Sequence, residues 1–328
     1  MKKINERRAL IVGIDRYKNK YYHRLTGCVA DAKKMKELLE INEDGSPNYA
    51  CRLLTDANPK QVTRAELRKA WRNLFREFSG QVLFFFSGHG GFSQVDNFLT
   101  TYDGIPGDPG LPMTEFLGIA ALSQASEVLI ILDCCYAGGI GNKLGSNIPG
   151  GLVLTELRQG ITVLAASGAK QTSKELNGHG LFTSLVIGAL SGGSADVRGY
   201  VSAASIYGYV EQALGPWDQR PLYKSYATTL SPIRRCKPTV PDEMLRDLPK
   251  LFKRPDARYR LDPTYEFTES KAVKSRVEIF RKFKLYRNAG LLRTVDDIDL
   301  FYAALDSRDI ELTPLGQFYW RLVSKKLL

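Results

Sequence analysis

The sequence predicts an α/β fold in which helices cover both faces of a mainly parallel sheet. Residues 82–86 and 128–132 are continuous apolar runs bounded by polar residues and glycines, which is typical of strands buried on both faces. Such runs alternate with amphipathic helical segments, as expected for βαβ units. Reactive side chains directly follow two of the strands, where open α/β sheets place their sites.

Composition and charge are those of a globular protein without a membrane span. The chain has 328 residues, of which 44% are apolar and 25% charged. Five cysteines, an odd number, indicate reduced thiols and a cytoplasmic location. The first apolar run is cut short by Asp15, so we expect no signal peptide, and no apolar stretch approaches ~18 residues. The net charge of +11 admits an anionic partner, but solvated surface charge is the favoured explanation.

The elements of the first part follow in order. A strand over residues 9–14 precedes a helix that begins near Asp31. Thr63 begins the next helix, with a capping box that Glu66 completes. The two apolar strands come next, separated by a Gly/Pro/Asp-rich stretch that predicts a loop over residues 103–112. The remaining predicted elements are a strand over residues 161–166, a helix over 181–190, a short element at 200–201 and a helix capped by Ser202.

The composition of the sequence changes near Cys236. We therefore predict one α/β domain over residues 1–235, followed by a linker or extended strap over residues 236–270, where five prolines punctuate a charged stretch. Helical periodicity returns in residues 271–328, which predicts a small helical module. Its last segment has a winged-helix appearance, although it lacks an obvious arginine- or lysine-rich recognition face.

A thiol and an imidazole follow two of the predicted strands. His89 comes just after the strand at residues 82–86, and Cys135 comes after the strand at 128–132, 46 residues further on. If these strands are neighbours, both side chains emerge at one edge of the sheet. Each residue alone has an ordinary structural explanation, as a core cysteine or a turn histidine. Together, flanked by glycines that let a peptide backbone approach, they predict a nucleophile and its general base.

The sequence resembles the caspase-like cysteine peptidases, and among them the metacaspase and orthocaspase branch. The resemblance covers roughly residues 8–230 and is carried by the segments ALIVGID, LTGCVADA, FFFSGHGG, LDCCYAGG, AASGAKQTS and HGLFTSLVIGAL. It implies a caspase-like three-layer α/β/α sandwich with a mainly parallel six-stranded sheet. It also implies a cysteine endopeptidase that acts through a thioester acyl-enzyme.

By the same resemblance, Cys135 is the nucleophile and His89 acts first as base and then as acid toward the leaving amine. The backbone N–H groups of Gly90 and Cys135 would form the oxyanion hole. Tyr136 stands where the metacaspase branch commonly has a histidine, which marks a divergent member. The branch tends to act as monomers.

Specificity is predicted to be for basic residues. The resemblance places four side chains around the pocket for the residue before the scissile bond, namely Cys28, Asp31, Ser87 and Asp133. Two carboxylates there favour a substrate arginine or lysine through charge-assisted hydrogen bonds. Leu25 stands where aspartate-specific caspases carry an arginine. Alternatively, Asp31 is a helix N-terminal acid favoured by the helix dipole.

Cofactors and self-cleavage are less clearly indicated. We expect no resident cofactor or metal. Calcium dependence is an open alternative, because Asp96, Asp103 and Asp108 are available but spread among turn residues. His179 is expected to serve a turn rather than catalysis. Two basic residues in or beside the glycine-rich segment at 139–151 are candidate self-cleavage sites, Lys143 and Arg158.

Two functions from different classes follow. The first is an active endopeptidase that cleaves protein substrates after arginine or lysine, while its C-terminal module recruits a regulator or substrate. The alternative is a catalytically silent caspase-like protein that acts in signalling, as an adaptor, or in nucleic-acid binding. The presence of His89 and Cys135 favours the first. Similar modules on bacterial caspase-like enzymes resemble adaptor domains, so partner recruitment is favoured over nucleic-acid binding, and no membrane partner is expected.

Overall fold

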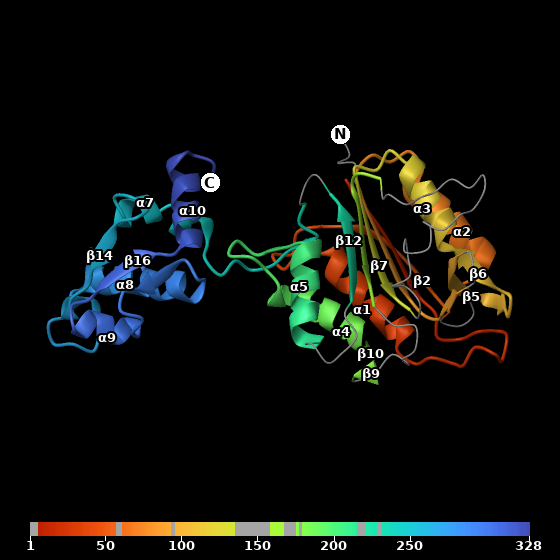
Figure 1. Cartoon of the computed structure of the whole chain (residues 1–328), viewed down its shortest axis with the longest axis horizontal. Helices are drawn as coiled ribbons and strands as arrows, with labels where there is room; N and C mark the ends of the chain where they lie inside the picture. The colour runs from red at the N-terminus through yellow and green to blue at the C-terminus, as the bar shows by residue number, and fades with distance from the viewer. Residues whose placement is uncertain are drawn as a thin grey trace, which may run out of the picture. The chain divides into compact units, whose positions relative to one another are not determined.

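The computed structural model consists of two compact units (Figure 1). One comprises Met1–Ala195 and Tyr200–Cys236, and the other comprises Asp196–Gly199 and Lys237–Leu328. No helix in the described parts of the chain is long and apolar enough to cross a bilayer. The structure describes residues 6–56, 61–92, 96–134, 158–166, 175–176, 179–214, 221–227 and 231–328.

A six-stranded sheet forms the centre of the first unit, in the order β12-β8-β7-β3-β1-β2. Five strands are parallel and β12 is antiparallel to β8, so the predicted mainly parallel sheet is confirmed. β3 and β7, the strands that precede His89 and Cys135, are neighbours. The strands are β1 (Arg7–Gly13), β2 (Ala50–Thr55), β3 (Gln81–Ser87), β7 (Glu127–Asp133), β8 (Ile161–Ala165) and β12 (Leu222–Tyr226).

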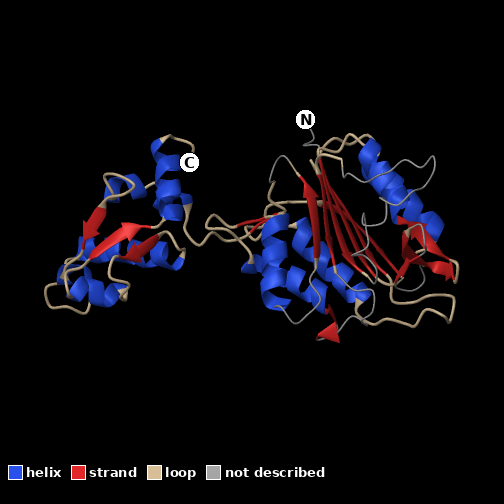
Figure 2. Ribbon diagram, viewed as in Figure 1, coloured by secondary structure: helices blue, strands red, loops and turns tan. Residues whose placement is uncertain are grey.

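Helices cover both faces of this sheet (Figure 2). Phe84 and Phe86 of β3 point into one buried cluster, and Leu83 and Phe85 point into the other. The strand is therefore apolar at every position because neither of its faces meets water. One face packs on α2 (Arg64–Phe75) and α3 (Met113–Leu122), and the other on α1 (Cys28–Glu40), α4 (Leu181–Gly188) and α5 (Ala203–Leu214).

A second, antiparallel sheet follows His89 and replaces the loop predicted over residues 103–112. Its strands are β4 (Gly90–Phe92), β5 (Asn97–Ile105) and β6 (Asp108–Pro112). The prediction of a loop is wrong because glycine here permits close strand pairing. A Cβ on Gly104 would lie 2.0 Å from the carbonyl oxygen of Pro109, and one on Gly110 would lie 2.0 Å from that of Leu99. Gly107 turns the chain at a φ of 87°.

Several local predictions are confirmed. Thr63 and Glu66 form the capping box of α2, and the Ser202 hydroxyl accepts a hydrogen bond from the Ser205 amide at the start of α5. The short elements of the first unit are β9 (Glu175–Leu176), β10 (His179–Gly180), the π-helical turn η2 (Ala189–Gly193), β11 (Tyr200–Val201) and β13 (Arg234–Arg235).

The main segment of the second unit begins at Lys237, so the predicted linker over residues 236–270 is wrong. Phe252, Leu261 and Tyr265 are buried with Phe280 and Phe283 in one core. Three of the five prolines, Pro241, Pro249 and Pro263, lie at the starts of short helices, since a missing N–H costs little there. The elements are α6 (Asp242–Leu245), α7 (Leu248–Leu251), β14 (Arg258–Arg260), the 3₁₀ turn η3 (Pro263–Tyr265), α8 (Lys274–Asn288), β15 (Leu292–Thr294), α9 (Leu300–Leu305), β16 (Asp309–Leu312) and α10 (Pro314–Ser324).

The second unit is also not purely helical. Its β14, β16 and β15 form a three-stranded antiparallel sheet, with β16 in the centre. These strands have only three or four residues each, too few to show an alternating pattern in the sequence. The predicted module over residues 271–328 is therefore part of a larger α+β unit, and it contains two of these strands, β15 and β16.

Candidate active site

The carboxyl ends of β1, β3 and β7 form one row at the edge of the central sheet. Gly13 lies opposite Ser87, and Ser87 lies opposite Asp133. The amide of Gly88 donates to the carbonyl oxygen of Asp133 at 3.2 Å, which joins the two strand ends. His89 follows β3 at this edge, and the buried Cys134 follows Asp133 at the end of β7. Cys135, the predicted nucleophile, lies outside the described residues.

His89 is held at this edge by three residues of the segment after β1. Its Nε2 lies 2.7 Å from the carbonyl oxygen of His23, and its amide donates to the Tyr17 hydroxyl at 2.7 Å. The rings of Tyr17 and Tyr22 lie 4.9 and 5.9 Å from the imidazole, between centroids. A carbonyl oxygen only accepts, so a neutral imidazole bonded to it carries its proton on Nε2 and has its lone pair on Nδ1.

Burial keeps His89 in the neutral form suited to a base. Desolvation lowers the pKa of its imidazole, the hydrogen bond to the His23 carbonyl opposes this shift, and the nearby His23 ring adds to it. The imidazole therefore stays neutral at pH values below the usual histidine pKa. That is the state required to accept a proton from a thiol.

The amide of Gly90 is directed away from the neighbouring strand β5. The Thr100 amide donates to the His89 carbonyl at 3.0 Å, so a ladder hydrogen bond is made one residue before Gly90. Gly90 pairs with Leu99 one residue further along, and in an antiparallel ladder the next pair is not hydrogen-bonded. The orientation suits a donor to a bound oxygen atom. The second predicted oxyanion donor, the Cys135 amide, lies outside the described residues.

Two carboxylates are buried beside this edge. Asp31 on α1 is 1% exposed and accepts hydrogen bonds from the Ser87 hydroxyl at 3.1 Å and the Gly180 amide at 3.4 Å. Asp133 is 8% exposed and accepts from the amide and hydroxyl of Thr183, at 3.2 and 2.6 Å. Burial raises the pKa of Asp133, and the Thr183 hydrogen bonds only partly offset this.

Gly180 brings the two carboxylates together, and Cys28 completes the cluster. A Cβ on Gly180 would lie 2.5 Å from Asp133 Oδ2 and 3.6 Å from Asp31 Oδ2, so both acids face the same glycine. Burial raises the pKa of the Cys28 thiol far above its usual range, with further increases from Asp31 and Asp133. Cys28 is therefore a neutral thiol and not a nucleophile. Cys28, Asp31, Ser87 and Asp133 thus lie together.

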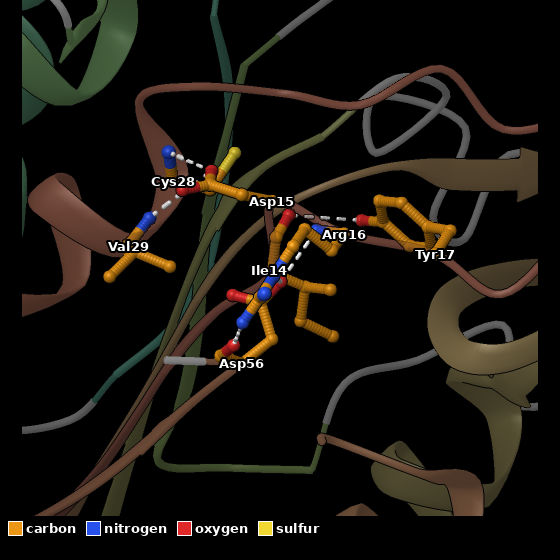
Figure 3. Close-up of polar contacts among 7 residues, drawn as sticks. All are labelled: Ile14, Asp15, Arg16, Tyr17, Cys28, Val29 and Asp56. Carbon is orange, nitrogen blue, oxygen red and sulfur yellow. Dashed lines mark hydrogen bonds and ion pairs between the residues drawn. The ribbon is translucent and has the colours of Figure 1, made fainter. Parts of the chain in front are cut away.

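Sequence reasoning missed a third acid, Asp15, at the same edge. Its Oδ1 accepts hydrogen bonds from the amides of Cys28 and Val29, at 2.8 and 3.4 Å (Figure 3). α1 has no side-chain cap of its own, so Asp15 caps it from the end of β1. The signal was present, because Asp15 follows an apolar strand just as Asp133 ends one. Thr183 and Tyr17 were also missed, and no local pattern marks them.

The acids considered for calcium do not form a shared site. Asp103 accepts from the Arg64 amide at 2.9 Å, and Asp108 pairs with the Arg64 guanidinium at 2.6 Å. Asp96 accepts from the hydroxyl of Thr114. Within the described ranges, no group of three or more histidine, cysteine, aspartate or glutamate side chains could hold a metal ion. The three predicted residues therefore do not fit a calcium ion, which needs several converging oxygens.

Of the two candidate self-cleavage residues, the structure describes Arg158. The Arg158 guanidinium donates to the carbonyl oxygens of Ala120 and Ala125, at 3.3 and 2.8 Å, and is half-buried. Lys143 lies outside the described residues. The backbone of His179 pairs with Leu176 in the short β9–β10 hairpin, and its side chain is outside the described part.

In this doubly covered, mainly parallel sheet, an imidazole lies at the carboxyl edge, where open α/β sheets place their sites. Comparison with known proteins identifies the family. Residues 6–231 match the family described as the caspase domain. The chain therefore belongs to the caspase domain family of cysteine peptidases, and its fold is the caspase-like α/β/α sandwich.

Two curated relatives are metacaspases. The chain is 32% identical over 151 residues to metacaspase-1 of Plasmodium falciparum (isolate 3D7), and 38% identical over 90 residues to metacaspase-3 of Arabidopsis thaliana. These matches cover 41% and 26% of this chain and 24% of each relative. The chain thus matches about a quarter of the length of either relative.

Solved structures with a related fold were also found. A protein from Geobacter sulfurreducens is 18% identical and caspase-1 from Spodoptera frugiperda is 12% identical, each with a TM-score of 0.49. They match 70% and 71% of this chain and 97% and 93% of their own chains.

Proposed function

We propose that this protein is a cysteine endopeptidase that cleaves protein substrates after arginine or lysine. Membership of the caspase domain family supports the chemistry. The observation that carries the basic specificity is the convergence of the Asp31 and Asp133 carboxylates on Gly180, beside the edge that holds His89. Hydrogen bonds from Ser87 and Gly180 orient Asp31, and those from Thr183 orient Asp133. A substrate cation gains charge-assisted hydrogen bonds worth ~1.5–3 kcal/mol each there.

The reaction begins with proton transfer from the Cys135 thiol to Nδ1 of His89. The thiolate attacks the carbonyl carbon of the basic residue, and the N–H groups of Gly90 and Cys135 donate to the resulting oxyanion. The C–N bond then breaks, His89 gives its proton to the leaving amine, and a thioester remains on Cys135. Water, deprotonated by His89, attacks the thioester and releases the carboxylic acid and the free thiol.

The contact with the His23 carbonyl supports this assignment for His89. It orients the ring through Nε2 and leaves the lone pair of Nδ1 for the thiol. An imidazole free to rotate would place its lone pair correctly only part of the time. The carbonyl oxygen thus serves as the orienting third group.

Self-cleavage, where it occurs, is proposed at Lys143 in preference to Arg158. Cleavage after Arg158 requires its guanidinium to leave the carbonyl oxygens of Ala120 and Ala125 and enter the carboxylate cluster. The amide of Ile161 also bonds to the Arg158 carbonyl, immediately before β8. Lys143 lies in a glycine-rich segment of the kind that proteases cut.

The second unit is proposed to recruit a regulatory or substrate protein. Leu315 and Phe318 lie three residues apart on α10 and are 45% and 54% exposed. Side chains at this spacing share one helix face, and exposed apolar groups on such a face suit protein contact. A cytoplasmic location is supported by four free thiols among the described residues, Cys28, Cys51, Cys134 and Cys236.

Fluorogenic peptides that differ only in the residue before the cut test this function. We expect cleavage after arginine and lysine, none after aspartate, and complete loss of cleavage in Cys135→Ala. Preference for aspartate would overturn the specificity. A folded protein that cleaves none of the peptides, and that an arginine ketone does not label, would instead support the silent alternative.

A further inference from the structure

Tyr17 makes two different contacts with His89. The hydroxyl of Tyr17 accepts the His89 amide hydrogen at 2.7 Å, and the tyrosine ring lies 4.9 Å from the imidazole, inclined at 50°. The Tyr17 hydroxyl lies so close to the backbone before His89 that it restricts which residue can stand at position 88. A Cβ on Gly88 would lie 2.9 Å from the Tyr17 hydroxyl, so the residue before His89 must be glycine for this contact to form.

Tyr17 is in turn fixed by the segment to which it belongs (Figure 3). Its hydroxyl donates to the carbonyl oxygen of Ile14 at 3.2 Å. The preceding residue, Arg16, is held through its amide and guanidinium by the buried Asp56 carboxylate, at 2.6 and 3.3 Å. Asp15 is bonded to the start of α1 through the Cys28 amide. The segment is therefore bonded to two separate elements, and Tyr17 has little freedom to move away.

We propose that Tyr17 is a positioning residue for His89, and that its hydroxyl and ring together set the place and orientation of the imidazole. This inference rests on the proposed role of His89 as general base. The hydroxyl fixes the main chain from which the imidazole projects, because it satisfies the His89 amide. The ring covers one side of the imidazole, so the His23 carbonyl meets Nε2 at hydrogen-bonding distance.

A structural role alone predicts different behaviour. If Tyr17 only stabilises the fold, its removal lowers the amount of folded protein but not the turnover of each folded molecule. If it positions His89, turnover falls while substrate affinity is kept, because the carboxylate cluster is untouched. The titratable groups described around the imidazole are Tyr17, Tyr22 and His23. Of these three side chains, that of Tyr17 has a described hydrogen bond to the main chain of His89.

The test compares Tyr17→Phe with wild type on an arginine peptide, with rates divided by the concentration of active sites titrated with an arginine ketone. We expect kcat to fall about 10-fold and KM to change less than about 2-fold, since a misplaced catalytic group costs one to two orders of magnitude in rate. The acidic limb of the kcat/KM profile should move to higher pH, because loosening the contact lets water reach the imidazole. Unchanged kcat and an unchanged acidic limb would overturn the proposal.

Tyr286→Phe is the matched control. It also removes a hydroxyl that donates to a main-chain carbonyl, that of Met244, but it does so in the second unit. We expect it to lower thermal stability and leave kcat unchanged. A fall in kcat equal to that of Tyr17→Phe would mean that any lost tyrosine hydroxyl has this effect, and would overturn the proposal.

Nuclear magnetic resonance of the imidazole groups separates this inference from the proposed function. The chain has only three histidines, so each resonance can be assigned by substitution. We expect the His89 titration to move to higher pH in Tyr17→Phe and to be unchanged in Tyr286→Phe, even if no peptide is cleaved. If wild type is inactive but this shift occurs, the proposed function fails and the positioning contact stands. If wild type is active and neither kcat nor the titration responds, the positioning role fails.

Discussion

Two pairs of acids in the first unit show what distinguishes a site from a surface. Asp31 and Asp133 come from a helix and a strand, are almost completely buried, and face one glycine. Asp103 and Asp108 belong to the β5–β6 hairpin and both bond to Arg64. The first pair lies in a place shielded from water, where electrostatic interactions are stronger than at the surface. In the second pair, an internal arginine already neutralises Asp108.

The largest expected effect is on cleavage after arginine. Asp31→Asn and Asp133→Asn each remove one charge from the cluster and keep the shape of the side chain. We expect kcat/KM for an arginine peptide to fall about 100-fold, the effect of losing one strong charge-assisted hydrogen bond. Steady-state kinetics on purified variants measure this.

Asp108→Asn is the matched control for that prediction. It removes a charge of the same kind from the hairpin, and we expect less than about 2-fold change, because a partly exposed ion pair contributes little. Equal losses in Asp108→Asn and Asp133→Asn would show that net charge, and not the cluster, governs cleavage.

Acidification should weaken the preference for arginine over citrulline, its neutral analogue. Burial raises the pKa of Asp133, so this carboxylate gains a proton above the ordinary value of 3.8 as pH falls. Burial also acts on Asp103, but hydrogen bonds from Thr101 and the Arg64 amide outweigh it and lower its pKa. Asp133 therefore loses its charge at a higher pH than Asp103 does. We expect the ratio of kcat/KM values for the two peptides to fall several-fold between pH 7 and pH 5.

The ratio is the useful quantity because both substrates depend equally on His89. A constant ratio over this range would mean that Asp133 stays ionised throughout, or does not face the substrate. Measurements on Asp133→Asn decide between these, since a carboxylate that does not face the substrate leaves the ratio at pH 7 unchanged when it is replaced.

A smaller effect concerns stability. The folded state binds the Asp133 proton more tightly than the unfolded state does, so this group's contribution to stability falls as pH rises through the interval above 3.8. Asp133→Asn removes this cost at neutral pH. We expect its Tm at pH 7 to exceed that of wild type by about 2–4 °C, and the difference to vanish below the ordinary pKa of aspartate. A lower Tm for Asp133→Asn at pH 7, by calorimetry, would show that the Thr183 bonds outweigh desolvation.

The smallest expected effect is that of calcium. Asp96, Asp103 and Asp108 are bonded to separate protein groups and do not converge. We expect addition of calcium or of a chelator to change kcat/KM by less than about 2-fold. A change of 10-fold or more would assign these hairpin acids, or others outside the described ranges, a role that their present contacts do not suggest.

Much of the peptidase fold could be predicted because its strands are buried on both faces. The apolar runs of β1, β3, β7 and β8 are visible without any tertiary information. The edge strand β2 was missed because its burial pattern is irregular and its composition mixed. The β5–β6 hairpin was missed because glycine and proline, which usually mark loops, here allow close pairing between strands.

Some residues of the candidate site could likewise be predicted from the sequence, and others could not. His89 and Asp133 could be predicted because each lies at or just after the end of an apolar strand. Tyr17 could not, because its contact with His89 spans 72 positions of the chain and depends on how an irregular segment is anchored. The predicted start of the second unit lies too far along the chain, because prolines at helix starts resemble those of a linker.

The central claim is that Cys135 is a nucleophile activated at this edge and served by a pocket for basic residues. Reaction with an arginine chloromethyl ketone, followed by intact mass measurement and peptide mapping, tests it most directly. We predict one adduct per chain, located on Cys135, that forms much more slowly in His89→Ala and Asp31→Asn. An adduct on Cys28, Cys51, Cys134 or Cys236, or labelling at an unchanged rate in His89→Ala, would contradict the account.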